Sequence, residues 1–154
     1  MLQKGFNKQV KRIIDTLAYS MYVVIRHEKY YCTCLNLHKS PDPNCPKCLG
    51  TGRKIEIRKI DGVLEPDELA ARMIGDNEKI SYNLYYFNAD KVEKSYINVG
   101  NIIVRDNEVE TLQALRTYRS DSNKPIYYYV KAIPKKDNLS IFLKNFYKIV
   151  GDAD

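Results

Sequence analysis

The chain has 154 residues, which is enough for one ordinary domain with a core of its own. Hydrophobic residues make up 44% and charged residues 29%, a globular balance that excludes a disordered or collagen-like chain. Lys and Arg exceed Asp and Glu by 25 to 19, and the resulting charge of +6 favours anionic partners but falls short of a typical nucleic-acid-binding composition.

No membrane or secretion signal is predicted. No uncharged stretch is longer than Thr16 to Ile25, which is much shorter than the roughly 18 residues of a membrane-spanning helix. Segment 4–12 is basic and precedes an apolar stretch, but Asp15 interrupts that stretch and no small-residue cleavage site follows. The sequence therefore predicts that the protein is located in the cytoplasm of the cell that makes it.

Apolar residues recur at helical spacing near the start of the chain. They are Phe6, Val10, Ile13, Ile14, Leu17, Ala18 and Met21. This spacing predicts an amphipathic helix over residues 6–20. Lys8, Lys11, Arg12 and Asp15 fall on its outer face, where we expect them to be solvated or to contact DNA or an acidic neighbour.

Two strands are predicted around the middle of the first half. Residues 22–31 are β-branched and aromatic, and residues 53–60 alternate apolar with charged side chains. Asp61-Gly62 is expected to end the second strand as a turn. A short helix is predicted from Pro66 to Ile74, closed by Gly75. Asp61, Glu65, Asp67 and Glu68 are interpreted as first-turn acids and caps of that helix.

Further strands follow in the second half, before a terminal helix. Alternation or β-branched composition predicts strands near 80–86, 101–104, 109–118 and 126–133, with polar connectors at 105–108 and 120–125. Asn138 is expected to cap a helix over 138–150 that Gly151 ends. The predicted fold class is α+β: a single domain, 1–154, with a small antiparallel β-barrel or sandwich flanked by N- and C-terminal helices.

All four cysteines lie within 17 residues, as Cys32-Thr33-Cys34 and Cys45-Pro46-Lys47-Cys48. Two such pairs can supply four thiolates to one tetrahedral zinc ion. Gly50 and Gly52 follow the second pair, and glycine adopts the positive φ angles that turn amides toward the sulfurs. The sequence therefore predicts a structural zinc ion held by Cys32, Cys34, Cys45 and Cys48 in an inserted loop, residues 31–53.

Other interpretations of the cysteines stay open. His27 or His38 is a possible replacement for Cys32 or Cys34 as a ligand, and two disulfides are possible in an oxidising compartment. An iron centre is also possible, although the first pair departs from the Cys-x-x-Cys spacing of rubredoxin-like sites. A site with four cysteine ligands leaves no open position for water or substrate, which disfavours catalytic zinc.

The loop is expected to be a stiff projection whose folding depends on metal, because the 21 residues between Tyr31 and Arg53 contain few large apolar side chains. Its tip, Leu35 to Asn44, is either an exposed turn or a partner contact. No phosphate-binding loop, dinucleotide fingerprint, nucleophile elbow or zinc-protease motif occurs in the sequence. The chain is therefore not expected to be an enzyme.

Segments 100–104 and 119–134, with the strand from Val109 between them, resemble the barrel of tailed-bacteriophage head-completion, or neck, proteins. The cysteine loop before a barrel strand is similar to zinc-bearing versions of such connectors. The resemblance implies a structural virion protein in the phage neck, assembled in the host cytoplasm. It implies a ring of identical subunits that joins the portal to neighbouring neck or tail proteins and surrounds the DNA channel, with possible non-specific contact to packaged DNA.

An alternative function is a zinc-ribbon module that binds nucleic acid. Lys39, Lys47, Arg53, Lys54 and Arg58 lie in or beside the loop and are its candidate contacts. Positive charge also occurs at Lys135, Lys136, Lys144 and Lys148, with acids interleaved, which is more typical of an ordinary mixed surface.

Overall fold

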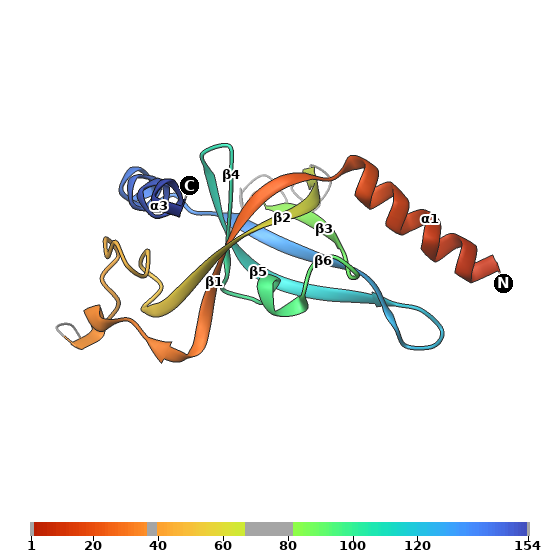
Figure 1. The fold of residues 1–154 in the computed structure, drawn as a ribbon, viewed down its shortest axis with the longest axis horizontal. Helices are drawn as coiled ribbons and strands as arrows, with labels where there is room; N and C mark the ends of the chain where they lie inside the picture. Colours follow the sequence, from red (N-terminus) through yellow and green to blue (C-terminus); the bar gives the residue numbers. More distant parts are fainter. Residues whose placement is uncertain (1, 37–39, 67–81, 154) are drawn as a thin grey trace, which may run out of the picture.

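The computed structural model describes residues 2–36, 40–66 and 82–153 and confirms the α+β class. Six antiparallel strands close into a barrel, and helices α1 and α3 lie at opposite ends of the long axis (Figure 1). The helices are α1 (Leu2–Leu17) and α3 (Leu139–Ala153), with short 3-10 helices η1 (Thr33–Asn36) and η2 (Lys94–Ile97). The strands are β1 (Tyr19–Tyr31), β2 (Arg53–Pro66), β3 (Asn83–Asn88), β4 (Ile102–Arg105), β5 (Glu108–Arg119) and β6 (Pro125–Pro134).

The strand order around the barrel is β1-β2-β3-β6-β5-β4, and pairing of β4 with β1 closes it. Strand β1 pairs with β2 continuously from Tyr19↔Gly62 to Arg26↔Ile55, and again at Tyr31↔Arg53 after a shift of register. The far ends of these two strands extend beyond the barrel, where the cysteine loop connects them (Figure 1). The loop is thus carried by a long two-stranded ribbon.

The barrel interior is filled by the alternate side chains of its strands. On β6, for example, Ile126, Tyr128, Val130 and Ala132 are buried while the intervening residues are half-buried. This is the two-residue period expected of a strand with one face in the core. The interior cluster contains Met21, Val23, Ile60, Tyr85, Phe87, Val92, Ile97, Ile103, Leu112, Tyr128, Val130 and Ala132.

The predicted turn at Asp61-Gly62 is wrong, because β2 runs through both residues to Pro66. Gly62 does not serve a turn conformation. A Cβ at this position would lie 2.4 Å from Cε1 of Phe87, so glycine is required to make room for a buried ring. Pro66, predicted as the start of a helix, ends β2 opposite Asn83. The remainder of that predicted helix, 67–74, lies outside the described residues.

Helix α3 covers a second cluster on the outside of the barrel. Phe142 and Phe146 are buried there with Val24, Leu49, Ile102, Val104 and Val109. The helix begins directly after Asn138, whose carbonyl accepts a hydrogen bond from the Phe142 amide at 3.0 Å. The predicted stop at Gly151 is wrong, since the helix continues to Ala153.

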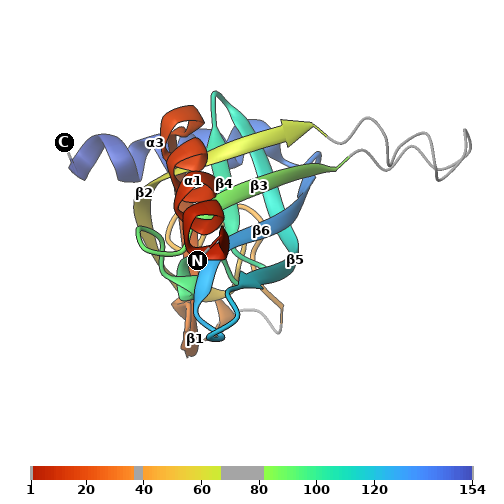
Figure 2. The ribbon, with the colours of Figure 1, turned by 90° about the vertical axis from the view of Figure 1, so that its right-hand side faces the viewer.

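Helix α1 ends at Leu17, and its buried face is not the predicted one. Phe6, Ile13 and Leu17 are 54%, 57% and 60% exposed, while Ile14 is buried. The expected outer face instead contacts the barrel. Lys11 Nζ lies 2.6 Å from Asp90 Oδ2, and Asp15 accepts hydrogen bonds from Asn88 Nδ2 at 3.0 and 3.1 Å. Figure 2 shows α1 lying across this end of the barrel.

The remaining boundaries differ from the predictions by a few residues. Strand β1 begins at Tyr19, three residues before the predicted strand, and β3 ends at Asn88, two residues beyond it. Within the described part of the chain, no helix has both the length and the apolar character needed to cross a bilayer.

Replacing Gly62 with Ala tests the role assigned to this glycine. The added methyl group must displace the Phe87 ring, so we expect Gly62→Ala to lower the free energy of unfolding by about 1–3 kcal/mol. Gly151→Ala is the matched control, because nothing lies within 4 Å of its Cβ position and alanine favours helix by about 0.5–1 kcal/mol. Urea denaturation measures both, and equal effects of the two substitutions would contradict this account.

Candidate metal centre

The four cysteines come from the connection between β1 and β2. Cys32 directly follows β1, Cys34 lies in η1, and Cys45 and Cys48 lie in the turns that precede β2. The amide of Cys32 donates to the carbonyl of Gly52 at 2.9 Å, which continues the ribbon by one more hydrogen bond. Strand pairing therefore brings the two cysteine pairs to the same place.

The sulfur atoms form a compact set. Cys32 Sγ lies 3.7 Å from Cys45 Sγ, and Cys34 Sγ lies 3.7 Å from Cys48 Sγ. All four sulfurs lie within 4.8 Å of one another. A tetrahedral metal ion with metal–sulfur bonds of about 2.3 Å requires sulfurs about 3.8 Å apart. The predicted cysteines are therefore brought together, in an arrangement that can hold one metal ion.

Disulfides and histidine ligands were the alternatives to a site with four cysteine ligands. The cysteines are free thiols, and sulfurs 3.7 Å apart are well beyond the bond length of about 2.05 Å in a disulfide. His27 is not among the clustered groups in the described part of the chain, and its ring lies against Tyr30 instead. His38 lies outside the described residues.

Backbone geometry after the second cysteine pair turns amides toward the sulfurs. Gly50 and Gly52 have φ angles of 85° and 73°, and Leu49 between Cys48 and Gly50 has φ of 55°. The amides of Gly52 and Gly50 donate to the Cys48 sulfur. A Cβ on Gly52 would lie 2.7 Å from Cγ of Pro41, so the far side of the loop also excludes a side chain here. Both positions thus require glycine because, as predicted, their positive φ angles turn amides toward the sulfurs.

The thiols differ in acidity. Burial raises the pKa of Cys32, but the Cys34 amide and the neighbouring thiols outweigh it and lower that pKa to about 7. Burial raises the pKa of Cys48 to about 12, against the opposing amides of Gly52 and Gly50. The Cys32 thiolate therefore forms readily, whereas the Cys48 thiol needs the charge of a bound cation to ionise at neutral pH.

The loop, which the β1–β2 ribbon carries beyond the barrel, is also anchored to the cluster beneath α3. Leu49 is 2% exposed and belongs to the cluster beneath α3. Asn145 Nδ2 of α3 also donates to the carbonyl of Asn44 at 3.3 Å. The sequence signal for this anchor is a single leucine between Cys48 and Gly50.

Arg53 supports the base of the loop from the other side. Its guanidinium lies 4.5 Å from the centroid of the Tyr31 ring and donates hydrogen bonds to the carbonyls of His27 and Glu28. These contacts span the shifted register of β1 and β2. Arg53 was predicted as a nucleic-acid contact, but its guanidinium is engaged within the protein.

A second polar cluster, which sequence reasoning missed, lies at the barrel wall. Glu110 is 1% exposed, and its Oε1 accepts from Tyr85 Oη at 2.8 Å and Arg105 Nη2 at 3.0 Å. Burial is the main cause that raises the pKa of Tyr85. Of the acids predicted to begin a helix, Asp61 and Glu65 lie in β2 and Asp67 and Glu68 lie outside the described residues.

Comparisons with known proteins do not assign the chain to a family. No protein-family model matches it, and no curated protein matches it closely enough to count as a relative.

Truncation of Leu49 tests how firmly the loop is anchored. We expect Leu49→Ala to lower the free energy of unfolding by about 2–5 kcal/mol, because it removes a buried side chain from the cluster beneath α3. Ile141→Ala is the control: Ile141 lies on α3 with 40% of its surface exposed, and we expect a change within about 0.5 kcal/mol. Similar small effects for both variants would mean that the loop does not contribute to the core.

Proposed function

We propose that Cys32, Cys34, Cys45 and Cys48 bind one structural zinc ion, and that the protein is a non-enzymatic, ring-forming head-tail connector of a tailed-phage neck. The observation that carries the metal assignment is the 3.7 Å separation within two sulfur pairs, which fits the edge of a zinc–thiolate tetrahedron. The connector role is supported by the resemblance of segments 100–104 and 119–134 to neck-protein barrels.

Zinc is the metal that best suits this donor set. Four sulfur ligands in a tetrahedron accept zinc or iron, and zinc has no geometric preference beyond the shape of its ligands. The Cys-x-Cys spacing of the first pair differs from the paired Cys-x-x-Cys loops of rubredoxin-like iron sites. With every ligand position filled by protein, the ion would stabilise the loop and leave no coordination position for a substrate.

Metal analysis of a cysteine variant tests this assignment. Inductively coupled plasma mass spectrometry of the reduced protein should give one zinc per chain, and Cys48→Ser should lose it. Thr33→Ala, an exposed change between two ligands, should retain it. We expect circular dichroism of Cys48→Ser to keep its β signal, because the interior cluster contains no loop residue. Unchanged metal content in Cys48→Ser would exclude the four-cysteine site. Iron in the wild type would show that the metal is not zinc and would leave the four-cysteine site in place.

The outer wall of the barrel supports assembly into a ring. Tyr86, Tyr118, Tyr127 and Tyr129 lie on the outward face of β3, β5 and β6, where Tyr118 and Tyr127 stack with ring centroids 4.9 Å apart. Half-buried tyrosines combine apolar area with a polar end that tolerates water, and they are enriched at protein interfaces. A ring requires that this wall contact a different face of the next identical subunit, with a rotation between neighbours that closes.

Native mass spectrometry of the zinc-loaded protein tests the ring. We expect a ladder or ring of subunits, and we expect Tyr127→Ala to shift the distribution toward monomer because it removes a ring from the centre of the tyrosine wall. Tyr30→Ala is the control, since Tyr30 is 62% exposed on the ribbon that carries the loop. A strict monomer, or equal loss of assembly in both variants, would count against a ring built on this wall.

The zinc-ribbon alternative is less well supported by the contacts of its basic residues. Besides Arg53, Arg58 is engaged within the protein, with Nη2 lying 2.6 Å from Glu56 Oε1 and its guanidinium over the Tyr96 ring. Lys39 lies outside the described residues, and Lys47 and Lys54 are the other two of the five candidates. A nucleic-acid binder would have to show affinity for DNA that falls steeply with salt, and a connector would not.

A further inference from the structure

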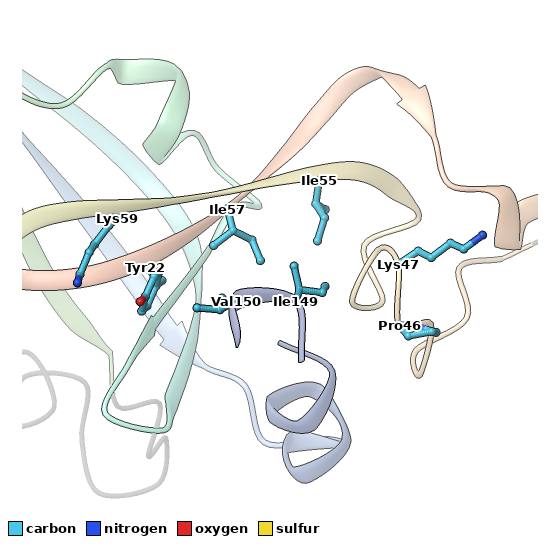
Figure 3. A pocket seen from close by; sticks show the side chains of 8 residues that line it. All are labelled: Tyr22, Pro46, Lys47, Ile55, Ile57, Lys59, Ile149 and Val150. Atoms are coloured by element: carbon cyan, nitrogen blue, oxygen red, sulfur yellow. The ribbon is translucent and has the colours of Figure 1, made fainter. Parts of the chain in front are cut away.

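An apolar groove lies between α3, the outer face of the β1–β2 ribbon and the cysteine loop. Its volume is about 640 Å³, and Ile55, Ile57, Ile149 and Val150 form its floor and one wall. Figure 3 shows these aliphatic side chains between Lys59 at one end and Lys47 at the other. We call this feature the α3 groove. Among the described residues, none of the ion pairs involves either lysine and no acidic side chain lines the groove. Lys59 Nζ lies 5.7 Å from the centroid of the Tyr22 ring, which also lines the groove.

We propose that the α3 groove binds an acidic amphipathic peptide segment of a partner protein. Aliphatic side chains of the segment would cover the isoleucines and Val150, and its carboxylates would pair with Lys47 and Lys59. A helix that lays its apolar face into a hydrophobic groove is a recurring mode of peptide recognition. The proposal concerns the partner surface and does not depend on whether that partner belongs to a phage neck.

Charge selects this occupant over the other candidates. A second copy could offer its own exposed apolar helix, α1, but Lys8 and Arg12 of that helix would then approach a groove whose charged residues, in the described part of the chain, are both lysines. A nucleic acid would satisfy the two lysines and leave the aliphatic floor without a partner. An acidic amphipathic segment matches both the charge at the ends and the apolar surface between them.

The cysteine loop supplies one end of the groove. Pro46 and Lys47 lie between Cys45 and Cys48, and the adjoining Leu49 fixes this turn in the cluster beneath α3. The groove floor is continuous with the same cluster, against which Ile55, Ile57, Ile149 and Val150 lie partly buried. The four-cysteine cluster and the buried Leu49 together hold the turn that carries Lys47, so loss of metal should weaken peptide binding without abolishing it.

Fluorescence anisotropy with a labelled probe peptide tests the proposal on the full-length, zinc-loaded protein. The probe is a helical peptide of about four turns with leucines along one face and glutamates at both ends, and the control peptide has lysine in place of each glutamate. We expect the acidic peptide to bind and the basic one not to bind. Lys47→Glu and Lys59→Glu should each weaken binding at least about tenfold.

Lys54→Glu is the matched control, because Lys54 carries the same charge on β2, is exposed and does not line the groove. Equal weakening by Lys54→Glu, equal binding of both peptides, displacement by an oligo-dT strand, or no binding would each overturn the proposal. Zinc content is measured for every variant. Lysine-dependent peptide binding in a wild type without metal would uphold the groove and reject the zinc assignment, so the two proposals fail separately.

Discussion

The connection between β1 and β2 must fold without a core of its own, and much of the molecule depends on how it does so. The ribbon delivers the two cysteine pairs to one point through the hydrogen bond between Cys32 and Gly52. The sulfur cluster then fixes the turn that contains Leu49. Since Leu49 lies in the cluster that seats α3, the cysteine geometry, the helix and the α3 groove are parts of one packed unit.

This arrangement strains the backbone at Leu49. Leu49 adopts φ of 55°, a region in which a residue with a Cβ is strained by on the order of 1 kcal/mol. Such strain persists only where the surroundings over-determine it. Here the Leu49 amide donates to the carbonyl of Cys45 and the Gly50 amide donates to the Cys48 sulfur, while the leucine side chain is buried in the cluster beneath α3. The strain therefore marks the point where the loop and the barrel are joined.

Features that depend on local pattern could be predicted from the sequence, and features that depend on distant contacts could not. The barrel strands and α3 follow from apolar periodicity, and the cysteine cluster follows from spacing. Gly62 is different, because its role is set by the Phe87 ring 25 positions away, which no local pattern reveals. Glu110 is buried for a similar reason: Arg105 and Tyr85 complete its environment only after the barrel has closed.

Helix α1 shows how an apolar stripe can mislead when the partner surface is not a core. Its spacing correctly predicts a helix, but Asn88, Asp90 and Lys91 bind the polar side, so the stripe of Phe6, Ile13 and Leu17 is turned outward. Amphipathicity fixes the period of a helix and leaves open which face the fold will use. The side that faces the barrel here combines the polar contacts of Lys11 and Asp15 with the buried Ile14.

The two ends of the molecule offer apolar surfaces of different kinds. At one end is a convex helical stripe flanked by basic side chains, and at the other is a concave groove that ends in two lysines. Because both carry positive charge, head-to-tail contact between identical copies is electrostatically unfavourable. The proposed ring instead uses lateral contact through the tyrosines of β3, β5 and β6. A ring built in this way would keep each end free for a different protein, which is the arrangement that a connector between two unlike structures requires.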